Sequence, residues 1–435
     1  MIIIDNALAD LAKNNRAIRT GIVGAGYIAS HLALQITDTN KGISLAAICS
    51  RNSEKAAAAM RMAKISDYSQ PTTQEEFDAA IRSGSRVIGT DPFMLCRSSE
   101  IDVVVEATGT IEYGAAVAME AIRCGKPIIL CNAELHATLG PILKWHADQA
   151  GVVFTDMDGD QPAVTMNLVR SLKTMGFKPV LCGNIKGMLD HYRTPVTQAA
   201  FAAEWGQSPK MVTSFADGSK IAFEQVVIAN ATGMHVGVRG MYGPTAIGDI
   251  RIENAADWFP HEAMEEGYGI VDYVIGAWPP AGIFVIARND SPIHQKRLEL
   301  YKLGKGPYYV FYTPTHLCGF ETINTIARAQ LFHDAAITPK GRQVAGVMAV
   351  AKADLPAGTV LDGIGGHHLY GLCENAVTMR NEGLLPLGLA EGCLLSRDVM
   401  KDEAISRHDV VLPAGRLCDR LDAEQNAMSE ACVDH

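Results

Sequence analysis

The 435-residue sequence lacks several features that mark particular classes of protein. Its ten cysteines include no CxxC pair, which argues against a zinc site or a disulfide framework and predicts reduced thiols, mostly in protein cores. No uncharged apolar run approaches the length that crosses a bilayer, so we expect no membrane partner. The opening residues show no charged segment followed by a long apolar one, so we expect no signal peptide and a cytoplasmic location.

A basic cluster is also missing. The net charge is −10, which disfavours nucleic acid as a partner, although local lysines and arginines can still hold a phosphorylated substrate. The chain is too long for one ordinary domain, and 48% hydrophobic residues are ample for conventional cores. We therefore expect a globular protein of two or three domains whose main partner is a small molecule.

A glycine motif near the N-terminus is the strongest positive signal. A short apolar run ends at Gly24, and Gly26 and Ala29 follow at the spacing of a strand that turns directly into a helix. In this arrangement Gly24 permits the tight turn, Gly26 lets the backbone approach a pyrophosphate, and Ala29 keeps the helix close to the strand. The motif predicts a dinucleotide site that includes Tyr27 and Ile28; a glycine turn in another α/β domain is the alternative.

The end of the second expected strand indicates which dinucleotide binds. NAD sites usually carry Asp or Glu there, whereas this chain has Ser50 and Arg51 after an apolar run at residues 43–49. A hydroxyl followed by a guanidinium suits a 2′-phosphate, so we predict NADP(H), as NADPH, over NAD. The alternative is that Arg51 is a solvated loop residue.

Further strands alternate with helices, as a doubly wound parallel sheet requires. A strand at residues 101–106 ends in Ala107, Thr108 and Gly109, and a strand at residues 128–131 precedes Asn132. Ligands bind at the carboxyl ends of such strands, so these residues are candidates for cofactor binding. They are otherwise ordinary turn residues.

An acidic stretch follows the expected strand at residues 151–155. Asp158 and Asp160 stand ahead of a helix, and aspartate oxygens are hard ligands that hold a cation or orient a polar substrate. Gln161 joins Asp160 as a candidate substrate residue. A solvated turn is the alternative.

Two later segments carry candidate catalytic side chains. An apolar strand from residue 180 leads into Lys186, His191 and Arg193, groups that suit phosphate binding or catalysis, with loop decoration as the alternative. Asp217, Lys220 and Glu224 fall along one stripe of an expected helix, which would place an ammonium between two carboxylates. A surface ion ladder has the same spacing, but the apolar surroundings of this stripe favour burial.

The rest of the chain has a different pattern. Glycine and proline rise over residues 239–290, where we expect antiparallel strands, one of them at 282–287, and we expect another strand at 308–312. From residue 344 a strand, acidic turn and strand pattern occurs twice, which predicts a small β-rich module. The tail after residue 420 is polar, and we expect it to fray.

Several motifs together resemble a known family. They are the glycine motif, Glu106-Ala-Thr-Gly109, Gly159-Asp-Gln-Pro-Ala163, Asp217-Gly-Ser-Lys220, Asn230-Ala-Thr-Gly233 and Asp354-Leu-Pro-Ala-Gly358. The chain resembles homoserine-dehydrogenase-like oxidoreductases with a C-terminal SAF domain, and within them the DXR-like (DRL) reductoisomerases. The latter convert 1-deoxy-D-xylulose 5-phosphate to 2-C-methyl-D-erythritol 4-phosphate with NADPH and a divalent metal. Homoserine dehydrogenases have Lys after the strand-end Asn, whereas Ala133 and Glu134 follow Asn132 here, which disfavours homoserine as substrate.

The resemblance implies a domain plan and roles for the candidate residues. It implies a Rossmann domain at residues 1–157, an α+β catalytic domain at 158–343, a SAF-like domain at 344–435, and a homodimer or homotetramer. Lys220 would stabilise or protonate a developing alkoxide, with Glu224 and Asp217 beside it. The remaining roles fall to Lys186, His191 and Arg193 for the phosphate, and to Asp158, Asp160 and Glu224 for Mn²⁺ or Mg²⁺.

Two other functions stay open. The first is a metal-independent NAD(P) dehydrogenase of a small polyol acid or hydroxy acid. The second is a nucleotide-sensing or carbohydrate-binding protein without catalysis, against which the charged stripe at residues 217–224 argues, since a sensor needs no such cluster.

Overall fold

The computed structural model describes residues 3–39 and 41–431. The chain divides into two compact units, Met1–Ala163 with Leu317–Thr338, and Val164–His316 with Pro339–His435. The residues from 344 onward thus share a unit with the middle of the chain, and a segment at 317–338 returns to the first unit. The division into three domains inferred from the sequence stays a prediction.

A seven-stranded parallel sheet forms the centre of the first unit, with strand order β3-β4-β2-β1-β5-β6-β7. The strands are β1 (Ile18–Val23), β2 (Ile43–Cys49), β3 (Tyr68–Ser69), β4 (Arg86–Gly89), β5 (Val103–Glu106), β6 (Ile128–Leu130) and β7 (Phe154–Asp156). The helices are α1 (Ile3–Lys13), α2 (Tyr27–Thr39), α3 (Ser53–Met62), α4 (Gln74–Arg82), α5 (Pro92–Arg97), α6 (Ile111–Arg123), α7 (Ala133–Ala150) and α14 (Thr322–Leu331). This order confirms the predicted doubly wound α/β fold.

Helix α14 reaches the first unit from far along the chain. Its Ile326 packs into the same core as Ile22 and Val105 of the sheet. The Arg328 guanidinium of α14 lies 3.1 Å from the Asp158 carboxylate, and both side chains are buried. Because a lone buried charge is costly, this ion pair fixes α14 against the end of β7.

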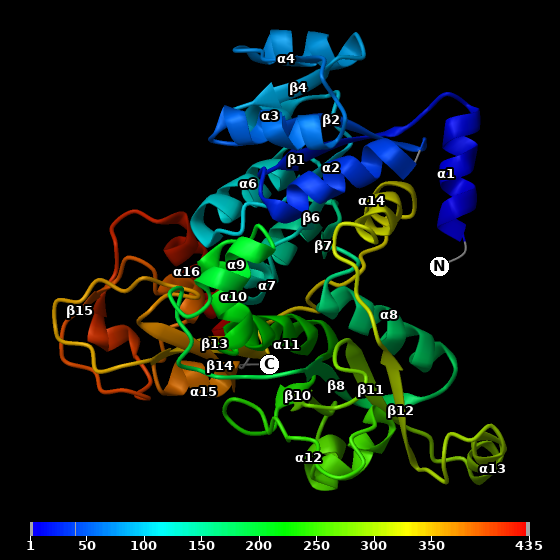
Figure 1. Ribbon diagram of the computed structural model, residues 1–435, viewed down its shortest axis with the longest axis vertical. Helices are drawn as coiled ribbons and strands as arrows, with labels where there is room; N and C mark the ends of the chain where they lie inside the picture. The colour runs from blue at the N-terminus through cyan, green and yellow to red at the C-terminus, as the bar shows by residue number, and fades with distance from the viewer. Residues whose placement is uncertain (1–2, 40, 432–435) are drawn as a thin grey trace. The chain divides into compact units, whose positions relative to one another are not determined.

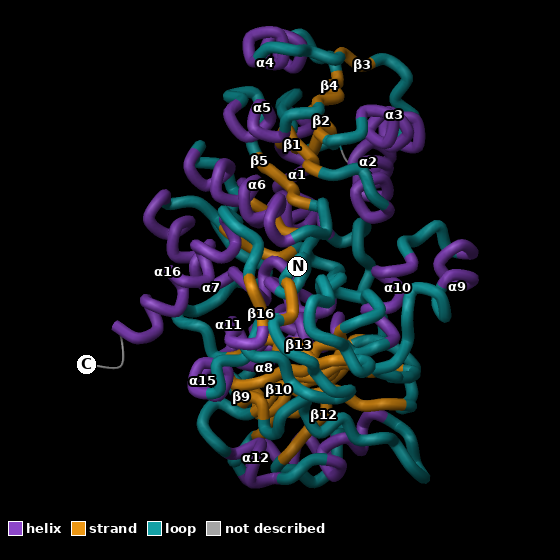
Figure 2. Tube along the Cα trace, turned by 90° about the vertical axis from the view of Figure 1, so that its left-hand side faces the viewer, coloured by secondary structure: helices purple, strands orange, loops and turns teal. Residues whose placement is uncertain are grey.

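The second unit contains a mixed sheet with strand order β12-β11-β8-β10-β9. Its strands are β8 (Lys178–Lys186), β9 (His235–Val236), β10 (Ile270–Ile275), β11 (Ile283–Arg288) and β12 (Tyr308–Thr313), and Figure 2 shows β9, β10 and β12 gathered above α12. The other elements are α8 (Gln161–Thr174), α9 (Ala199–Glu204), α10 (Pro209–Ala216), α11 (Ser219–Thr232), the 3₁₀ helix η1 (Ile252–Trp258), α12 (His261–Glu265) and α13 (Pro292–Leu300).

The strand directions correct one expectation. Strands β11 and β12 are antiparallel to their neighbours as predicted, but β10 runs parallel to β8 and to β9. The antiparallel prediction for residues 239–290 is therefore wrong at β10. The chain between β8 and β10 contains helices α9 to α11, which is ample length for the crossover that a parallel pair requires.

Helix α11 is the most enclosed element of the second unit. Thirteen of its fourteen residues are buried, and it packs on β8, β10, β13 and β14. Figure 1 shows β13 and β14 beside it. A helix that is apolar nearly all round must be covered on every side, so the C-terminal strands complete this core.

The C-terminal region forms small antiparallel pairs, β13 with β14 and β15 with β16. Its elements are β13 (Ala345–Ala351), β14 (Leu369–Asn375), α15 (Ala376–Asn381), η2 (Leu387–Leu389), β15 (Leu394–Leu395), η3 (Arg407–Asp409), β16 (Val410–Val411) and α16 (Leu417–Ala431). The β-rich character agrees with the prediction, while the assignment to the SAF family stays a prediction.

The expectation of a frayed tail is wrong for the described residues. Helix α16 buries Cys418, Leu421 and Gln425, which recur at helical spacing along one face. An ion pair of 2.7 Å between Arg407 and Asp422 holds the helix to η3.

Two further expectations concern cysteines and membrane spans. Each cysteine that the structure describes is free, in agreement with the prediction of reduced thiols; Cys432 lies outside the described residues. Among the described helices, none combines the length and the apolar character needed to cross a bilayer.

Asp272 of β10 supports a prediction about stability. Its buried carboxylate accepts hydrogen bonds from the backbone N–H groups of Tyr242, Gly243 and Tyr273 at 2.8–2.9 Å. Burial raises the pKa of Asp272 to about 7 despite these donors. We expect Asp272→Ala to lower the free energy of unfolding by about 3 kcal/mol, because buried donors lose their acceptor.

Chemical denaturation followed by circular dichroism measures this loss. Asp272→Asn is the matched control, because its single oxygen keeps an acceptor for Gly243 and Tyr273, and we expect a smaller loss. Equal stability of the Ala variant and the parent protein would contradict the prediction.

Candidate functional site

A cavity of about 200 Å³ lies at the carboxyl ends of β1, β2 and β5 in the first unit. Its lining comes from the predicted glycine turn, the end of β2, the start of α3 and the loop after β5. The lining residues are Gly24, Ala25, Gly26, Cys49, Ser50, Arg51, Lys55, Ala107, Thr108 and Tyr113. This is the edge at which parallel sheets of this kind bind dinucleotides.

Gly24 and Gly26 are suited to glycine for different structural reasons. Gly24 has φ of 113°, and a Cβ there would lie 2.4 Å from the carbonyl oxygen of Ala107. A Cβ at Gly26 would meet no atom within 4 Å, so the space beside this residue is open to a ligand. A close backbone turn followed by an open approach fits the pyrophosphate of a dinucleotide.

The predicted Tyr27 and Ile28 begin helix α2, which follows the glycine turn. Tyr27 is exposed and packs beside His31, whereas Ile28 is partly buried against the core of the unit. Neither side chain lines the cavity. Their contribution is therefore the N-terminal end of the helix, whose backbone N–H groups favour a phosphate.

The end of β2 supports the prediction of a 2′-phosphate. The Arg51 guanidinium lies 5.1 Å from the centre of the Tyr113 ring, and Lys55 lines the same cavity. The described lining contains these two cations and no carboxylate. The sequence analysis did not predict Lys55 and Tyr113 as lining residues. A cation such as Lys55 in the first turn of the helix after β2 is a signal that could have identified one of them.

A buried carboxylate organises the loop after β5. Glu106 accepts hydrogen bonds from the backbone N–H of Thr108 at 2.7 Å, from the Thr108 hydroxyl, and from the Asn132 amide at 3.0 Å. Burial raises the pKa of Glu106. Thr108 thus faces the cavity from a fixed loop that continues to Gly109, where φ is 67°.

Asn132 follows the end of β6, as predicted, and its side chain is bound within the protein. It is buried, its Oδ1 accepts the backbone N–H of Leu135 at the start of α7, and its amide donates to Glu106 and to the carbonyl oxygen of Thr110. It is not among the residues that line the cavity. Its direct contact with the cofactor stays a prediction, while its role in holding Glu106 is visible.

A second group of candidate residues gathers between β8 and α11 in the second unit. The Asn184 amide donates to the Glu224 carboxylate at 2.9 Å, which joins the strand to the helix. Lys186 follows Asn184 on the same face of β8, and Lys220 precedes Glu224 by one turn of α11. The structure therefore brings together three residues that the sequence analysis selected, Lys186, Lys220 and Glu224.

Electrostatics connects these groups further. The pKa of Lys186 lies below its ordinary value because burial penalises the ammonium; Glu224 opposes this effect, Lys220 adds to it, and Asp217 opposes it. A lysine with a lowered pKa gives up its proton more readily than an ordinary lysine. The arrangement suits proton transfer to an oxygen atom of a substrate.

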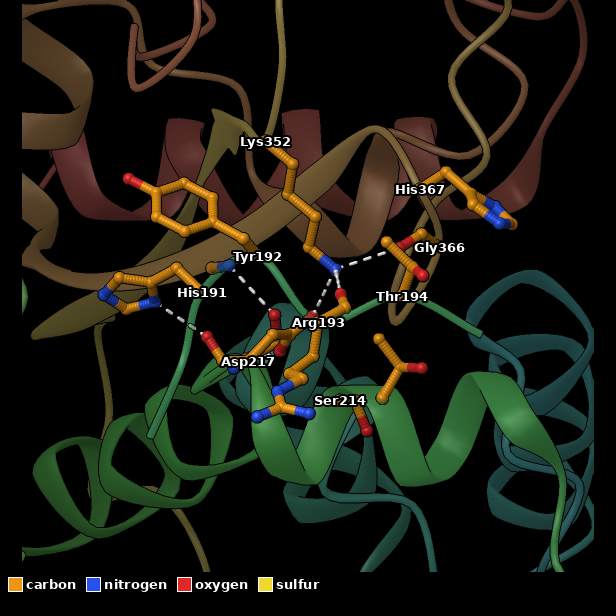
Figure 3. Close-up of polar contacts among 12 residues, drawn as sticks. His191, Tyr192, Arg193, Thr194, Ser214, Asp217, Lys352, Gly366 and His367 are labelled. Carbon is orange, nitrogen blue, oxygen red and sulfur yellow. Dashed lines mark hydrogen bonds and ion pairs between the residues drawn. The ribbon is translucent and has the colours of Figure 1, made fainter. Parts of the chain in front are cut away.

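The structure corrects the role expected of Asp217. This residue precedes α11, and its carboxylate pairs with the Lys352 ammonium at 2.7 Å instead of forming one helical stripe with Lys220. Both side chains are buried. Figure 3 shows Lys352 above Asp217, with His191 directed at the Asp217 backbone. Local spacing predicted the wrong partner, because the correct one lies 135 residues away.

His191 and Arg193 lie on the loop after β8. The His191 ring nitrogen Nδ1 lies 2.8 Å from the carbonyl oxygen of Asp217, and the ring stacks on Tyr370. Arg193 is partly exposed and its Nε donates to the Asp190 carboxylate at 2.9 Å. The loop thus presents a cation near the start of α11.

The predicted metal ligands do not form one group of donors. The Asp158 carboxylate is bound by Arg328 and by the Thr325 hydroxyl, all within the first unit. Asp160 accepts the backbone N–H of Gln161 at 3.0 Å, and both residues are buried, whereas Glu224 belongs to the second unit. Within residues 3–39 and 41–431, no three His, Cys, Asp or Glu side chains are placed to hold a metal ion. A cation beside Arg328 does not fit, so we derive no step through a metal.

Two family models match this chain. Residues 18–132 match the oxidoreductase family with an NAD-binding Rossmann fold, and residues 159–322 match the catalytic domain of oxidoreductase DRL. Both models describe oxidoreductase domains, and the first describes an NAD-binding Rossmann fold. The two matches cover the cofactor cavity and the cluster of Lys186, Lys220 and Glu224.

Comparison with individual proteins gives only distant likenesses, and no curated protein matches the chain. The scyllo-inositol dehydrogenase of Lactobacillus casei is 14% identical, with 73% of this chain and 90% of that chain covered and a TM-score of 0.39. A DOX-P reductoisomerase solved with NADPH, fosmidomycin and magnesium is 13% identical, with 48% and 57% covered and a TM-score of 0.33.

An oxidoreductase from Agrobacterium radiobacter, solved with NAD⁺, L-tartaric acid and magnesium, is 16% identical. The match covers 42% of this chain and about half of that chain, 48%, with a TM-score of 0.29.

The cavity geometry predicts the cofactor preference. We expect Arg51→Gln to weaken NADPH binding about 10- to 100-fold, because a charge-assisted hydrogen bond to the 2′-phosphate contributes about 1.5–3 kcal/mol. NADH, which lacks this phosphate, should bind with nearly unchanged affinity. Titration of both cofactors by calorimetry measures the two constants.

Arg61→Gln is the matched control, because Arg61 is an exposed arginine at the far end of α3. An equal loss of affinity for both cofactors in Arg51→Gln would remove Arg51 from 2′-phosphate recognition.

Proposed function

We propose that this protein catalyses the NADPH-dependent reductive isomerisation of 1-deoxy-D-xylulose 5-phosphate to 2-C-methyl-D-erythritol 4-phosphate. The observation that carries the proposal is the partly buried cluster of Lys186, Lys220 and Glu224, which lies inside the segment matched by the DRL catalytic model. The cations beside the cofactor cavity support NADPH over NADH.

The chemistry divides between cofactor and protein. Bound NADPH supplies the hydride that reduces a carbonyl carbon. The ammonium groups of Lys186 and Lys220 stabilise negative charge on the substrate oxygen, and one of them donates the proton that forms the alcohol. Glu224, held by Asn184, raises the pKa of Lys186 and so favours the charged form of that lysine.

The loop after β8 suits a phosphorylated substrate. Arg193 and His191 lie on this loop, and Asp190 holds the Arg193 guanidinium through Nε. A planar guanidinium fixed on one side binds a phosphate with directed hydrogen bonds. We assign the phosphate group of the substrate to this loop. We also propose that the protein assembles as a homodimer or homotetramer.

A second candidate function has its own support. The predicted metal ligands are not assembled within the described residues, and a dehydrogenase of a small polyol acid or hydroxy acid needs no such set. In that reaction the same lysines exchange a proton with the substrate hydroxyl, and the loop cations hold a carboxylate in place of a phosphate.

The first prediction of the proposal concerns the substrate. We expect NADPH oxidation when 1-deoxy-D-xylulose 5-phosphate is added with Mg²⁺ or Mn²⁺, with 2-C-methyl-D-erythritol 4-phosphate as the product detected by mass spectrometry. The same assay with a chelator measures the need for a metal. NADPH binding without turnover would reject the reductoisomerase, and a panel of polyol acids and hydroxy acids would then test the second candidate.

The second prediction concerns pH. If Lys186 donates a proton, the rate falls as pH rises through the pKa of Lys186. The negative charge of Glu224 raises that pKa, so Glu224→Gln should move the falling limb of the pH–rate profile to lower pH. Glutamine keeps an oxygen for the Asn184 amide and thus preserves the contact between β8 and α11.

Glu262→Gln is the control, because Glu262 is an exposed glutamate in α12. An unchanged falling limb in Glu224→Gln would show that Lys186 is not the group that titrates.

A further inference from the structure

Lys352 is a buried lysine that the proposed chemistry does not use. Its ammonium donates hydrogen bonds to the Asp217 carboxylate at 2.7 Å, to the carbonyl oxygen of Arg193 at 2.8 Å and to that of Gly366 at 2.9 Å (Figure 3). An ammonium has three N–H bonds, so every donor of Lys352 is engaged.

The three acceptors come from separate segments of the second unit. Arg193 belongs to the loop after β8, Asp217 directly precedes α11, and Gly366 lies in the turn before β14. The other oxygen of Asp217 accepts the backbone N–H of Ser219 at 2.8 Å, which fixes the first turn of α11. Lys220 is the next residue, so its starting position depends on Asp217.

Neighbouring contacts hold the same loop to the same C-terminal region. Tyr192 and Tyr370 both donate from their hydroxyl groups to Asp402, and His191 stacks on the Tyr370 ring at 4.4 Å between centres. The loop after β8 therefore depends on residues contributed by the C-terminal region.

We propose that Lys352 is a positioning residue, which sets the loop of Arg193 and the first turn of α11 relative to each other. The proposal rests on the proposed function in assigning substrate binding to these two segments. Stability alone does not explain the pair, because a buried ion pair is often no more stabilising than apolar residues of the same volume. Three directed hydrogen bonds to three segments provide what an apolar pair cannot, a fixed geometry.

The test separates stability from positioning by comparing single and paired substitutions in the full chain. Lys352→Met leaves the Asp217 charge buried without its partner and should be strongly destabilised. The double variant Lys352→Met with Asp217→Asn carries no buried charge at this pair, and the side-chain oxygen of the introduced asparagine still accepts from Ser219. Its melting temperature should therefore recover most of the loss. The carbonyl oxygens of Arg193 and Gly366 still lack their donor.

We expect the double variant to exchange backbone hydrogens at residues 190–194 at least tenfold faster than the parent protein. With 1-deoxy-D-xylulose 5-phosphate we expect kcat below a tenth of the parent value and a raised KM, while the NADPH Kd stays within twofold. The matched control is Arg407→Met with Asp422→Asn, which removes another ion pair of the second unit and should leave exchange at 190–194 and turnover unchanged.

Parent-like exchange at 190–194 and parent-like turnover in the double variant would overturn the proposal, and so would failure of the double variant to fold, which would make Lys352 a structural residue. Absence of turnover in the parent protein would reject the proposed function instead. Hydrogen exchange needs no substrate, so it decides the role of Lys352 in either case.

Discussion

The near-complete burial of helix α11 is the constraint on which the second unit depends. Polar side chains that such a helix buries are shielded from water, so each of them needs a partner from a neighbouring segment. Ser219 accepts the backbone N–H of Gly371 in β14, Asn230 accepts those of Val344 and Ala345, and Glu224 meets Asn184 in β8. These partners tie the C-terminal strands and the mixed sheet to one helix, and that helix carries Lys220.

The same principle governs the first unit on a smaller scale. Glu106 is a buried carboxylate at the end of β5, and three donors from Thr108 and Asn132 satisfy it. Satisfying the carboxylate determines the conformation of the loop that lines the cofactor cavity. In both units a buried carboxylate near the carboxyl end of a strand fixes a loop, and that loop carries residues predicted to bind a ligand.

Sequence reasoning predicted the parts that depend on local pattern. The parallel strands follow from apolar runs of strand length, and the glycine turn follows from positions where only glycine fits, as the clash of a Cβ at Gly24 with Ala107 demonstrates. The cations at the end of β2 were partly visible, since Arg51 was selected and Lys55 was not. Site residues at a fixed spacing after a strand can therefore be predicted from the sequence.

Ion pairs between residues far apart in the sequence could not be predicted from the local pattern. Asp217 was placed with Lys220 by helical spacing, yet its partner Lys352 lies on another segment; Asp158 was considered a metal ligand, yet Arg328 binds it. Periodicity reports only neighbours three or four residues apart, and it carries no information on which distant cation satisfies a buried carboxylate. The error is systematic, because carboxylates that look like ligands in a sequence are also the groups most in need of an internal ion pair.

The charge balance of the second unit's cluster gives these pairings a chemical meaning. Lys186, Lys220 and Lys352 contribute three ammonium groups, while Glu224 and Asp217 contribute two carboxylates, so one positive charge is in excess. Lys352 uses its charge on Asp217, which leaves two lysines sharing Glu224. A partly buried site with excess positive charge stabilises an oxygen atom that becomes negative more strongly than it stabilises a neutral carbonyl. The Lys352 ammonium thus offsets the charge of Asp217, which would otherwise add to that of Glu224 beside Lys186.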